Sequence, residues 1–247
     1  MSGIAFDLQA RVDTARALLA RVAREHPAAV FTTSFGAEDM VLFDLIAGYD
    51  DDLGLAMKPI VVATLDTGRL PDETYQLWQE STRRYRRKVE PYFPESPAVE
   101  TFVRLHGINA FYDSLAERKA CCHIRKVEPL ARALDGRQAW ITGMRRAQSS
   151  TRADLEVEGW DAEHRLTKFN PLADWSEGDT WDYLRARDVP VNALHARGYP
   201  SIGCAPCTRA VAAGEDVRAG RWWWESADAK ECGLHAKADD NVLAQPA

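Results

Sequence analysis

The sequence predicts an α/β fold: a Rossmann-like, mostly parallel sheet with helices on both faces. Three short apolar runs carry this prediction, because each ends in a turn that contains glycine. The first two runs are each followed by residues with helical spacing. Short apolar strands that alternate with helices are what a parallel sheet covered on both faces requires.

Each element rests on its own pattern. The N-terminal helix is amphipathic, with apolar side chains at helical spacing. Ser176 is placed to cap a later helix that runs through Trp181 and Leu184. Between these regions the pattern changes at about residue 150, and residues 148–168 are polar. The predicted strands are 28–33, 60–65 and 139–142, and the predicted helices are 8–25, 40–46, 72–85, 117–134 and 176–184.

The turns after the three strands predict where a ligand binds. In open parallel sheets, ligands sit beyond the carboxyl ends of the strands. We therefore expect these turns to converge on one crevice. They are Ser34-Phe35-Gly36, Asp66-Thr67-Gly68 and the turn that starts at Gly143.

Composition limits the class of protein. A chain of 247 residues can bury an ample core, and its net charge of −6 argues against nucleic acid as a partner. No apolar stretch approaches the ~18–20 residues that span a bilayer. The first residues lack the pattern of a signal peptide, so we expect a cytoplasmic protein with reduced thiols. The sequence leaves open whether the chain forms a homo-oligomer.

Four of the five cysteines form two tight pairs. Cys121 and Cys122 are adjacent, and Cys204 and Cys207 form a CxxC. Thiolates bind zinc and iron–sulfur clusters alike, so both stay open. The alternative without metal is that Cys121 and Cys122 are buried small apolar residues and that the CxxC is a chance pair or a redox dithiol. Adjacent residues on a helix point about 100° apart, which favours local distortion or a four-iron centre over one ion. Lys126, one turn after Cys122, would compensate negative charge on such a centre.

The fifth cysteine, Cys232, has the surroundings of a nucleophile. His235 follows it closely, and Arg218 and Arg221 lie upstream. Cations near a thiol favour the reactive thiolate and can also hold an anionic substrate. A bystander thiol is the alternative. The tryptophans at 222–224 are interpreted as packing residues that attach the C-terminal tail to the body.

Together these motifs resemble the assimilatory adenylyl-sulfate and phosphoadenylyl-sulfate reductases, specifically their iron–sulfur, thioredoxin-dependent adenylyl-sulfate branch. The resemblance covers roughly residues 30–235, and the double cysteine, the CxxC and the C-terminal ECGLH make it specific. The motifs that carry it span residues 33–39, 64–68, 121–126, 142–146, 203–207, 214–225 and 231–235.

The resemblance implies one fold and one chemistry. It implies a single domain over residues 1–235 of the adenine nucleotide alpha hydrolase-like type, with the cluster half at about 118–210. Residues 236–247 have little to bury, so we expect a flexible tail there. Cys232 would attack the sulfur of adenosine 5′-phosphosulfate, form an S-sulfocysteine and expel AMP. Thioredoxin would then release sulfite, a step of sulfate assimilation and cysteine biosynthesis. One 4Fe-4S cluster per chain is implied on Cys121, Cys122, Cys204 and Cys207.

The resemblance also implies the substrate site. Cations would stabilise the negative charge that develops on the bridging phosphate oxygen. The first loop resembles the phosphate loop of ATP pyrophosphatases but has no lysine, and Glu38 and Asp39 start its helix instead. The implied substrate-binding residues are Ser34, Gly36, Leu65, Asp66, Gly68, Lys126, Gly143, Arg152, Arg218, Arg221 and His235.

Three alternatives remain at this point. The same fold could reduce phosphoadenylyl sulfate, although family members that prefer this substrate often lack the four cluster cysteines. A zinc-stabilised binding module, in which Cys232 is incidental, belongs to a different class. An ATP pyrophosphatase-like ligase is disfavoured by the missing lysine in the first loop.

Overall fold

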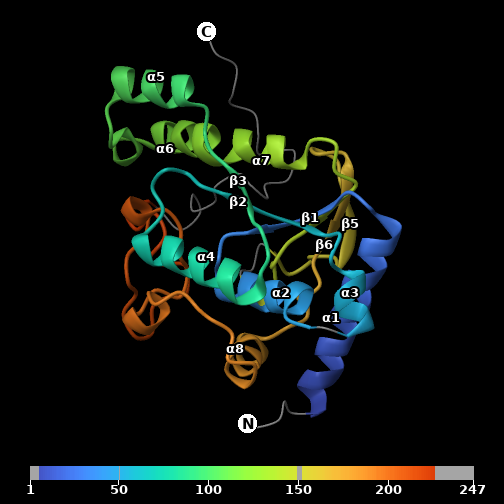
Figure 1. The fold of residues 1–247 in the computed structure, drawn as a ribbon. Coiled ribbons are helices and arrows are strands. Elements are labelled where there is room, and N and C mark those ends of the chain that lie inside the picture. Colours follow the sequence, from blue (N-terminus) through green and yellow to red (C-terminus); the bar gives the residue numbers. More distant parts are fainter. Residues whose placement is uncertain (1–5, 50, 149–151, 226–247) are drawn as a thin grey trace.

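The computed structural model describes residues 6–49, 51–148 and 152–225. It shows a six-stranded sheet in the order β3-β2-β1-β4-β6-β5, in which only the β5–β6 pair is antiparallel (Figure 1). The predicted tail, residues 236–247, lies outside the described residues. The strands are β1 Ala29–Thr33, β2 Val61–Leu65, β3 Glu90–Tyr92, β4 Ala139–Ile141, β5 Glu158–Asp161 and β6 Leu166–Phe169.

Helices cover both faces of the sheet, as the sequence predicts. Along β1, Phe31 points to the larger apolar core, and its neighbour Val30 points to the smaller one. Helices α1, α2, α4 and α8 supply the larger core, and α7 supplies the smaller one (Figure 1). Their bounds are α1 Phe6–Glu25, α2 Ala37–Ala47, α4 Asp72–Tyr85, α7 Glu128–Leu134 and α8 Glu177–Ala186.

The remaining helices of the described chain differ from the predicted elements. The predicted helix over 117–134 is interrupted by a π-helical turn, His123–Val127, between α6 Leu115–Cys122 and α7. The short α3 Asp52–Ala56 and the longer α5 Ser96–His106 have no counterpart among the predicted elements. Ser176 caps α8 as predicted, and its hydroxyl accepts a hydrogen bond from the Asp179 amide at 3.0 Å.

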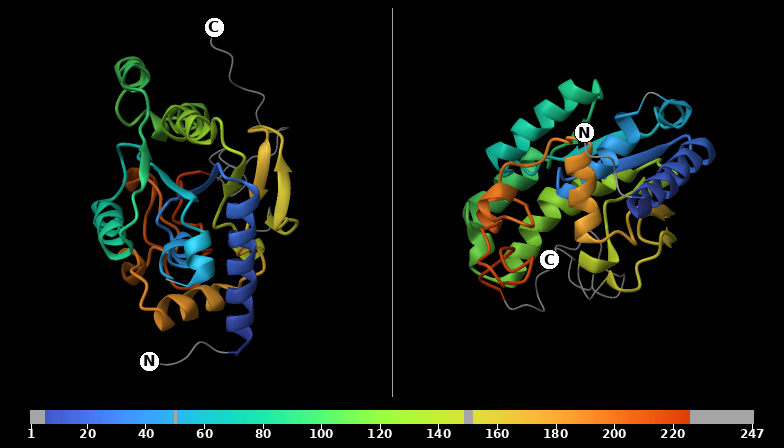
Figure 2. Two further views of the ribbon diagram at one scale, coloured as in Figure 1. Left: turned by 45° about the vertical axis from the view of Figure 1, so that its right-hand side comes forward. Right: turned by 90° about the horizontal axis from the view of Figure 1, so that it is seen from below.

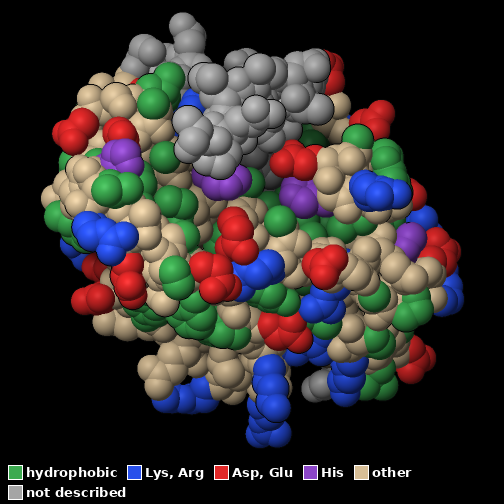
Figure 3. Space-filling model, turned by 90° about the horizontal axis from the view of Figure 1, so that it is seen from above, with side chains coloured by type: hydrophobic (Ala, Val, Ile, Leu, Met, Phe, Trp, Pro, Cys, Tyr) green, Lys and Arg blue, Asp and Glu red, His purple; other side chains and the backbone are tan. Residues whose placement is uncertain are grey.

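The β5–β6 pair extends the sheet and is formed largely by residues of the polar stretch 148–168. Helix α1 runs beside it (Figure 2), and Arg21 of α1 pairs with Glu158 of β5 at 2.5 Å. The ring of His26, in the loop between α1 and β1, lies 5.5 Å from that of Phe169 in β6. On the face that carries α5 to α7, acidic and basic side chains lie interspersed with apolar ones (Figure 3). No helix in the described part of the chain is long and apolar enough to cross a membrane.

The strand order places a topological switch point between β1 and β4. From β1 the chain moves outward through β2 to β3 and then returns to the other side of β1 as β4. The loops that leave β1 and β4 therefore diverge and open a crevice at the carboxyl ends of these two strands. The fold thus places the crevice where the turns at Gly36 and Gly143 meet.

A buried carboxylate joins α2 to α8. Asp44 is 1% exposed and accepts hydrogen bonds from the hydroxyls of Tyr183 at 2.6 Å and Tyr85 at 3.0 Å. The guanidinium of Arg187 donates to it at 3.1 Å. Such a network is costly to break on one side, because the remaining groups stay buried without a partner.

We expect Asp44→Asn to lower the free energy of unfolding by about 2–4 kcal/mol, measured by urea denaturation. The matched control is Asp182→Asn, which removes an exposed ion pair with Arg185. Exposed pairs contribute little, so the control should change the unfolding free energy by less than about 0.5 kcal/mol. Equal effects of the two substitutions would contradict the role given to Asp44.

Candidate functional site

A cavity of about 800 Å³ lies at the switch point of the sheet. This volume falls in the range of small-molecule sites, roughly 300–1,000 Å³. The cavity extends from the loops after β1, β2 and β4 to the segment between α8 and the end of the described chain. Eight of the predicted substrate-binding residues line it: Ser34, Gly36, Leu65, Lys126, Gly143, Arg152, Arg218 and Arg221.

Asp66 and Gly68 are the predicted residues of the described chain that the cavity wall leaves out. The Asp66 carboxylate accepts hydrogen bonds from the Gly68 amide at 2.9 Å and from the Tyr75 hydroxyl at 2.8 Å. Gly68 has a φ of +69°, a conformation that favours glycine. Both residues belong to the turn after β2, where Leu65 and Thr67 line the cavity. The remaining predicted substrate-binding residue, His235, and the predicted nucleophile, Cys232, lie outside the described residues.

The first loop is held by the start of the helix that follows it. The amide and hydroxyl of Ser34 both donate to the Asp39 carboxylate, at 2.6 and 2.8 Å. Gly36 caps α2. A Cβ on Gly143 would lie 2.3 Å from Asp39 Oδ1, so this glycine lets the loop after β4 approach α2. The Ser34 hydroxyl is therefore engaged within the protein, while its residue still lines the cavity.

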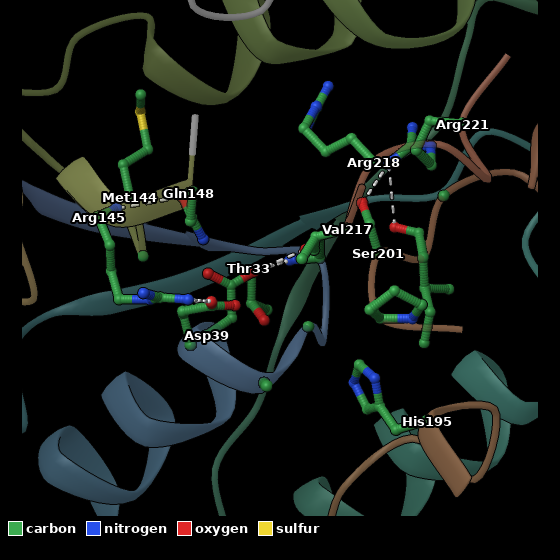
Figure 4. Close-up of a pocket in the computed structure, with 18 of the residues that line it drawn as sticks. Thr33, Asp39, Met144, Arg145, Gln148, His195, Ser201, Val217, Arg218 and Arg221 are labelled. Carbon is green, nitrogen blue, oxygen red and sulfur yellow. Dashed lines mark hydrogen bonds and ion pairs between the residues drawn. The ribbon is translucent and has the colours of Figure 1, made fainter. Parts of the chain in front are cut away.

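An ion pair braces the same side of the cavity. Arg145, 5% exposed, donates to Glu38 Oε1 through Nε at 3.0 Å and Nη2 at 2.6 Å. The side-chain oxygen of Gln148 accepts from the Arg145 amide at 3.1 Å and from Arg152 at 2.5 Å (Figure 4). Neither Arg145 nor Gln148 was among the predicted site residues. Arg145 belongs to the 142–146 motif, whereas Gln148 carries no sequence signal.

Cations occupy the opposite side of the cavity. Arg218 and Arg221 lie together there beside Ser201 (Figure 4). Arg221 is 8% exposed, and a Cβ on Gly203 would lie 2.4 Å from its Nη2. Glycine at that position therefore allows the guanidinium to lie directly against the backbone. With Lys126 and Arg152, the cavity wall carries several cations that an anionic ligand would meet.

The four paired cysteines converge beside this cavity. Cys121, Cys122, Cys204 and Cys207 line one cleft, together with Phe111, Pro206 and the cations Arg69, Arg118, Arg125 and Lys126. Lys126 and Cys204 line both the cleft and the large cavity, so the two spaces share a wall. The Thr67 hydroxyl lies 3.3 Å from Cys204 Sγ.

The surroundings of the cleft suit a centre with thiolate ligands. Among the described residues, no three His, Cys, Asp or Glu side chains are placed to hold a single metal ion. The chemistry of the four thiols and of their neighbours therefore decides whether a thiolate-bound centre fits this cleft. Four thiols meet beside buried cations, and the π-helical turn directly after Cys122 distorts the helix locally, as two adjacent ligands would require. Thiolates in an apolar cluster need such cations nearby.

Two of these thiols respond differently to their surroundings. Burial raises the pKa of Cys207 to about 12, with the neighbouring Cys204 adding to the effect. Burial alone would also raise the pKa of Cys204, but Lys126, the Thr67 hydroxyl and Arg221 outweigh it and lower that pKa. The cations at the shared wall thus favour negative charge on Cys204.

The last residues of the described chain pack beside the four cysteines. Trp222 is fully buried against the cysteines, with the guanidinium of Arg118 4.6 Å from its ring centre. Arg118 also donates to both oxygens of the Glu225 carboxylate at 2.9 Å. Trp224 packs on Tyr112 at 4.4 Å. Packing by the tryptophans is thus confirmed for these two, whereas the tail that they were expected to attach lies outside the described residues.

Comparison with known proteins identifies relatives along most of the chain. The family model described as Phosphoadenosine phosphosulfate reductase domain matches residues 28–210. The Adenosine 5′-phosphosulfate reductase of Allochromatium vinosum is 52% identical over 230 residues, 93% of this chain and 87% of that protein. The protein of the same name from Burkholderia cepacia is 53% identical over 229 residues, which cover 93% and 89%.

Solved structures confirm the predicted fold class. The phosphate complex of phosphoadenylyl-sulfate reductase from Candida auris superimposes with a TM-score of 0.66 at 25% identity, covering 84% of this chain and 99% of that one. Yeast FAD synthetase in complex with FAD gives a TM-score of 0.59 at 14% identity, with 85% and 70% covered. The second likeness concerns the fold alone.

Asp39 generates a prediction about pH. Removal from water raises its pKa from 3.8 to about 6, although the two Ser34 hydrogen bonds oppose this. The folded state therefore binds this proton more tightly than the unfolded state, and the resulting stabilisation is present below pH 3.8 and lost as the pH rises through about 6. Relative to Asp39→Asn, we expect the wild type to lose about 1–3 kcal/mol of unfolding free energy between about pH 4 and pH 7.

Urea denaturation of both proteins at the two pH values measures this difference. The substitution keeps an acceptor for Ser34 and removes only the titration. A difference between the two proteins that stays constant with pH would contradict the assignment.

Proposed function

The chain belongs to the phosphoadenosine phosphosulfate reductase family, and we propose that it reduces adenosine 5′-phosphosulfate to sulfite and AMP. This makes it an oxidoreductase that acts on a sulfur group. The observation that carries the proposal is the shared wall, where Lys126 and Cys204 separate a cation-lined, nucleotide-sized cavity from the four-cysteine cleft. Identities of 52% and 53% to proteins named adenosine 5′-phosphosulfate reductase support the substrate.

We assign binding roles by the charge of the cavity wall. Lys126, Arg152, Arg218 and Arg221 would hold the phosphosulfate, since guanidinium and ammonium groups match its oxyanions. The loops at Gly36, Leu65 and Gly143 would hold the nucleoside. This division follows the placement of Arg218 and Arg221, which lie together beside Ser201 on one side of the cavity, across from Asp39 (Figure 4). Arg152 lies on the other side, where it donates a hydrogen bond to Gln148.

Cys232 is the proposed nucleophile. Its thiolate would attack the sulfur of the phosphosulfate, forming a sulfur–sulfur bond while the bond from sulfur to the bridging oxygen breaks. AMP leaves with that oxygen, and the cations of the cavity stabilise its negative charge. A dithiol reductant, proposed to be thioredoxin, then attacks the Cys232 sulfur, releases sulfite and supplies both electrons as it becomes a disulfide.

The four-cysteine cleft is the proposed site of one 4Fe-4S cluster. Cys121, Cys122, Cys204 and Cys207 would be its ligands, and the cluster would supply a fixed, charged centre next to the substrate cavity. Lys126 lies in the wall between them and would interact with both. The proposal also includes a cytoplasmic location and a place in sulfate assimilation and cysteine biosynthesis.

The choice between the two family substrates is also part of the proposal. The complete set of four cysteines and the relatives' names favour the substrate without a 3′-phosphate. Glu38 and Asp39 on the cavity wall oppose an additional phosphate nearby. Competition of both substrates at limiting concentration would reveal the preference, and equal turnover would contradict it.

Cys232→Ser tests the nucleophile. Wild-type protein incubated with adenosine 5′-phosphosulfate and no reductant should gain one sulfonate on the peptide that contains Cys232, detected by mass spectrometry. The variant should bind AMP and iron as the wild type does, yet form neither the adduct nor sulfite. Sulfite release by the variant would contradict the assignment.

Cys207→Ser tests the cofactor and serves as the reciprocal control. Loss of one thiolate ligand should lower iron per chain and remove most of the activity, because the cluster depends on all of its ligands. Iron content is measured on anaerobically purified protein beside the wild type and Cys232→Ser. Unchanged iron in Cys207→Ser would contradict the ligand set.

A further inference from the structure

His195 has a defined tautomer in this structure. It begins the short helical turn His195–Arg197 that follows α8, and its Nδ1 lies 2.9 Å from the backbone oxygen of Tyr199. A carbonyl oxygen can only accept, so Nδ1 carries the proton of this hydrogen bond. The ring also meets Trp181 edge-on, with 5.2 Å between the ring centres. The imidazole is therefore fixed in place on two sides.

The second nitrogen of the ring is left as a buried acceptor. In the neutral imidazole with a proton on Nδ1, Nε2 can only accept a hydrogen bond. Burial lowers the pKa of His195, which favours this neutral form over the charged one. Nε2 is buried and has no hydrogen-bond partner within the described part of the chain. A buried unsatisfied polar atom is costly, and native structures keep few of them.

The position of His195 shows what its acceptor would meet. The residue lines the large cavity, and its ring extends into the space between Asp39 on one side and Ser201 on the other (Figure 4). Glu38 lines the same region, with its carboxylate held by Arg145. Arg218 and Arg221 lie farther along the wall (Figure 4). A ligand group at His195 therefore meets acceptors, whereas an anionic group is favoured at the arginines.

We propose that Nε2 of His195 accepts a hydrogen bond from an O–H or N–H group on the nucleoside part of the bound nucleotide. This inference rests on the proposed function, which puts an adenosine nucleotide in the cavity. An adenosine offers donors of this kind at its 2′-hydroxyl, its 3′-hydroxyl and its 6-amino group. Ionised phosphate and sulfate oxygens only accept, so they are excluded as partners of this atom. His195 would thus be a residue that determines specificity for the nucleoside.

Two substitutions separate this role from a structural one. His195→Asn can keep a donor where Nδ1 meets the Tyr199 oxygen, but it has no atom at the position of Nε2. His195→Gln reaches that position with an amide oxygen and so restores an acceptor. The ligands are AMP and three analogues that each lack one donor: 2′-deoxy-AMP, 3′-deoxy-AMP and purine riboside 5′-monophosphate.

Calorimetric titration of the cluster-containing protein gives the dissociation constants. In the wild type, one analogue should bind about 5- to 30-fold more weakly than AMP, the effect of leaving a buried acceptor without its donor. In His195→Asn that ratio should fall towards one, because AMP itself loses the hydrogen bond. His195→Gln should recover most of the ratio.

If the ratios for all three analogues are the same in the wild type and in His195→Asn, the proposal is wrong. The sulfonate adduct on Cys232 separates this failure from a failure of the proposed function. Wild-type protein that forms the adduct but shows unchanged ratios overturns only the role of His195. Protein that binds no AMP and forms no adduct overturns both.

Discussion

Buried positive charge around buried sulfur is the constraint on which the rest of this structure depends. Arg118, Arg125, Lys126 and Arg221 are all 8% exposed or less. Cations at that depth require negative or polar partners, since an unpaired buried charge is very costly. Some partners are within the chain, such as Glu225 for Arg118 and the Thr67 oxygen for Arg125. Cys204 lies beside Lys126 and Arg221, which lower its pKa and so favour negative charge on its sulfur.

The fold meets this constraint with segments that are far apart in sequence. Cys121 and Cys122 end α6, whereas Cys204 and Cys207 lie in a loop after α8. The turn after β2 joins the two, because the Arg69 backbone oxygen accepts from the Ala205 amide at 2.8 Å while Arg69 lines the cysteine cleft. The β2 turn therefore contributes to both spaces. A site of this kind can form only after the sheet has brought these segments together.

The sequence predicted the parts of the molecule that have strong local patterns. Strands β1, β2 and β4 are apolar because they are buried on both faces, and the structure confirms all three. Strands β3, β5 and β6 were missed, because edge and antiparallel strands need no apolar run, and β3 contains Pro91. That Nε2 of His195 lacks a partner among the described residues depends on tertiary contacts, which no sequence window contains. The cations of the cavity were predicted through their motifs rather than through their geometry.

The last segment of the described chain links the cysteines to the substrate cavity. Arg221 lines the cavity, and its neighbour Trp222 is buried against the cysteines, although Trp222 has a φ of +41° that a tryptophan seldom adopts. Gly203, directly before Cys204, has no side chain and so leaves room for the Arg221 guanidinium. A displacement of either the CxxC loop or the tryptophan would therefore also move Arg221. Binding of the proposed cofactor by the cysteines and of the proposed anionic substrate in the cavity would thus be coupled through two adjacent residues, and each would stabilise the arrangement that the other requires.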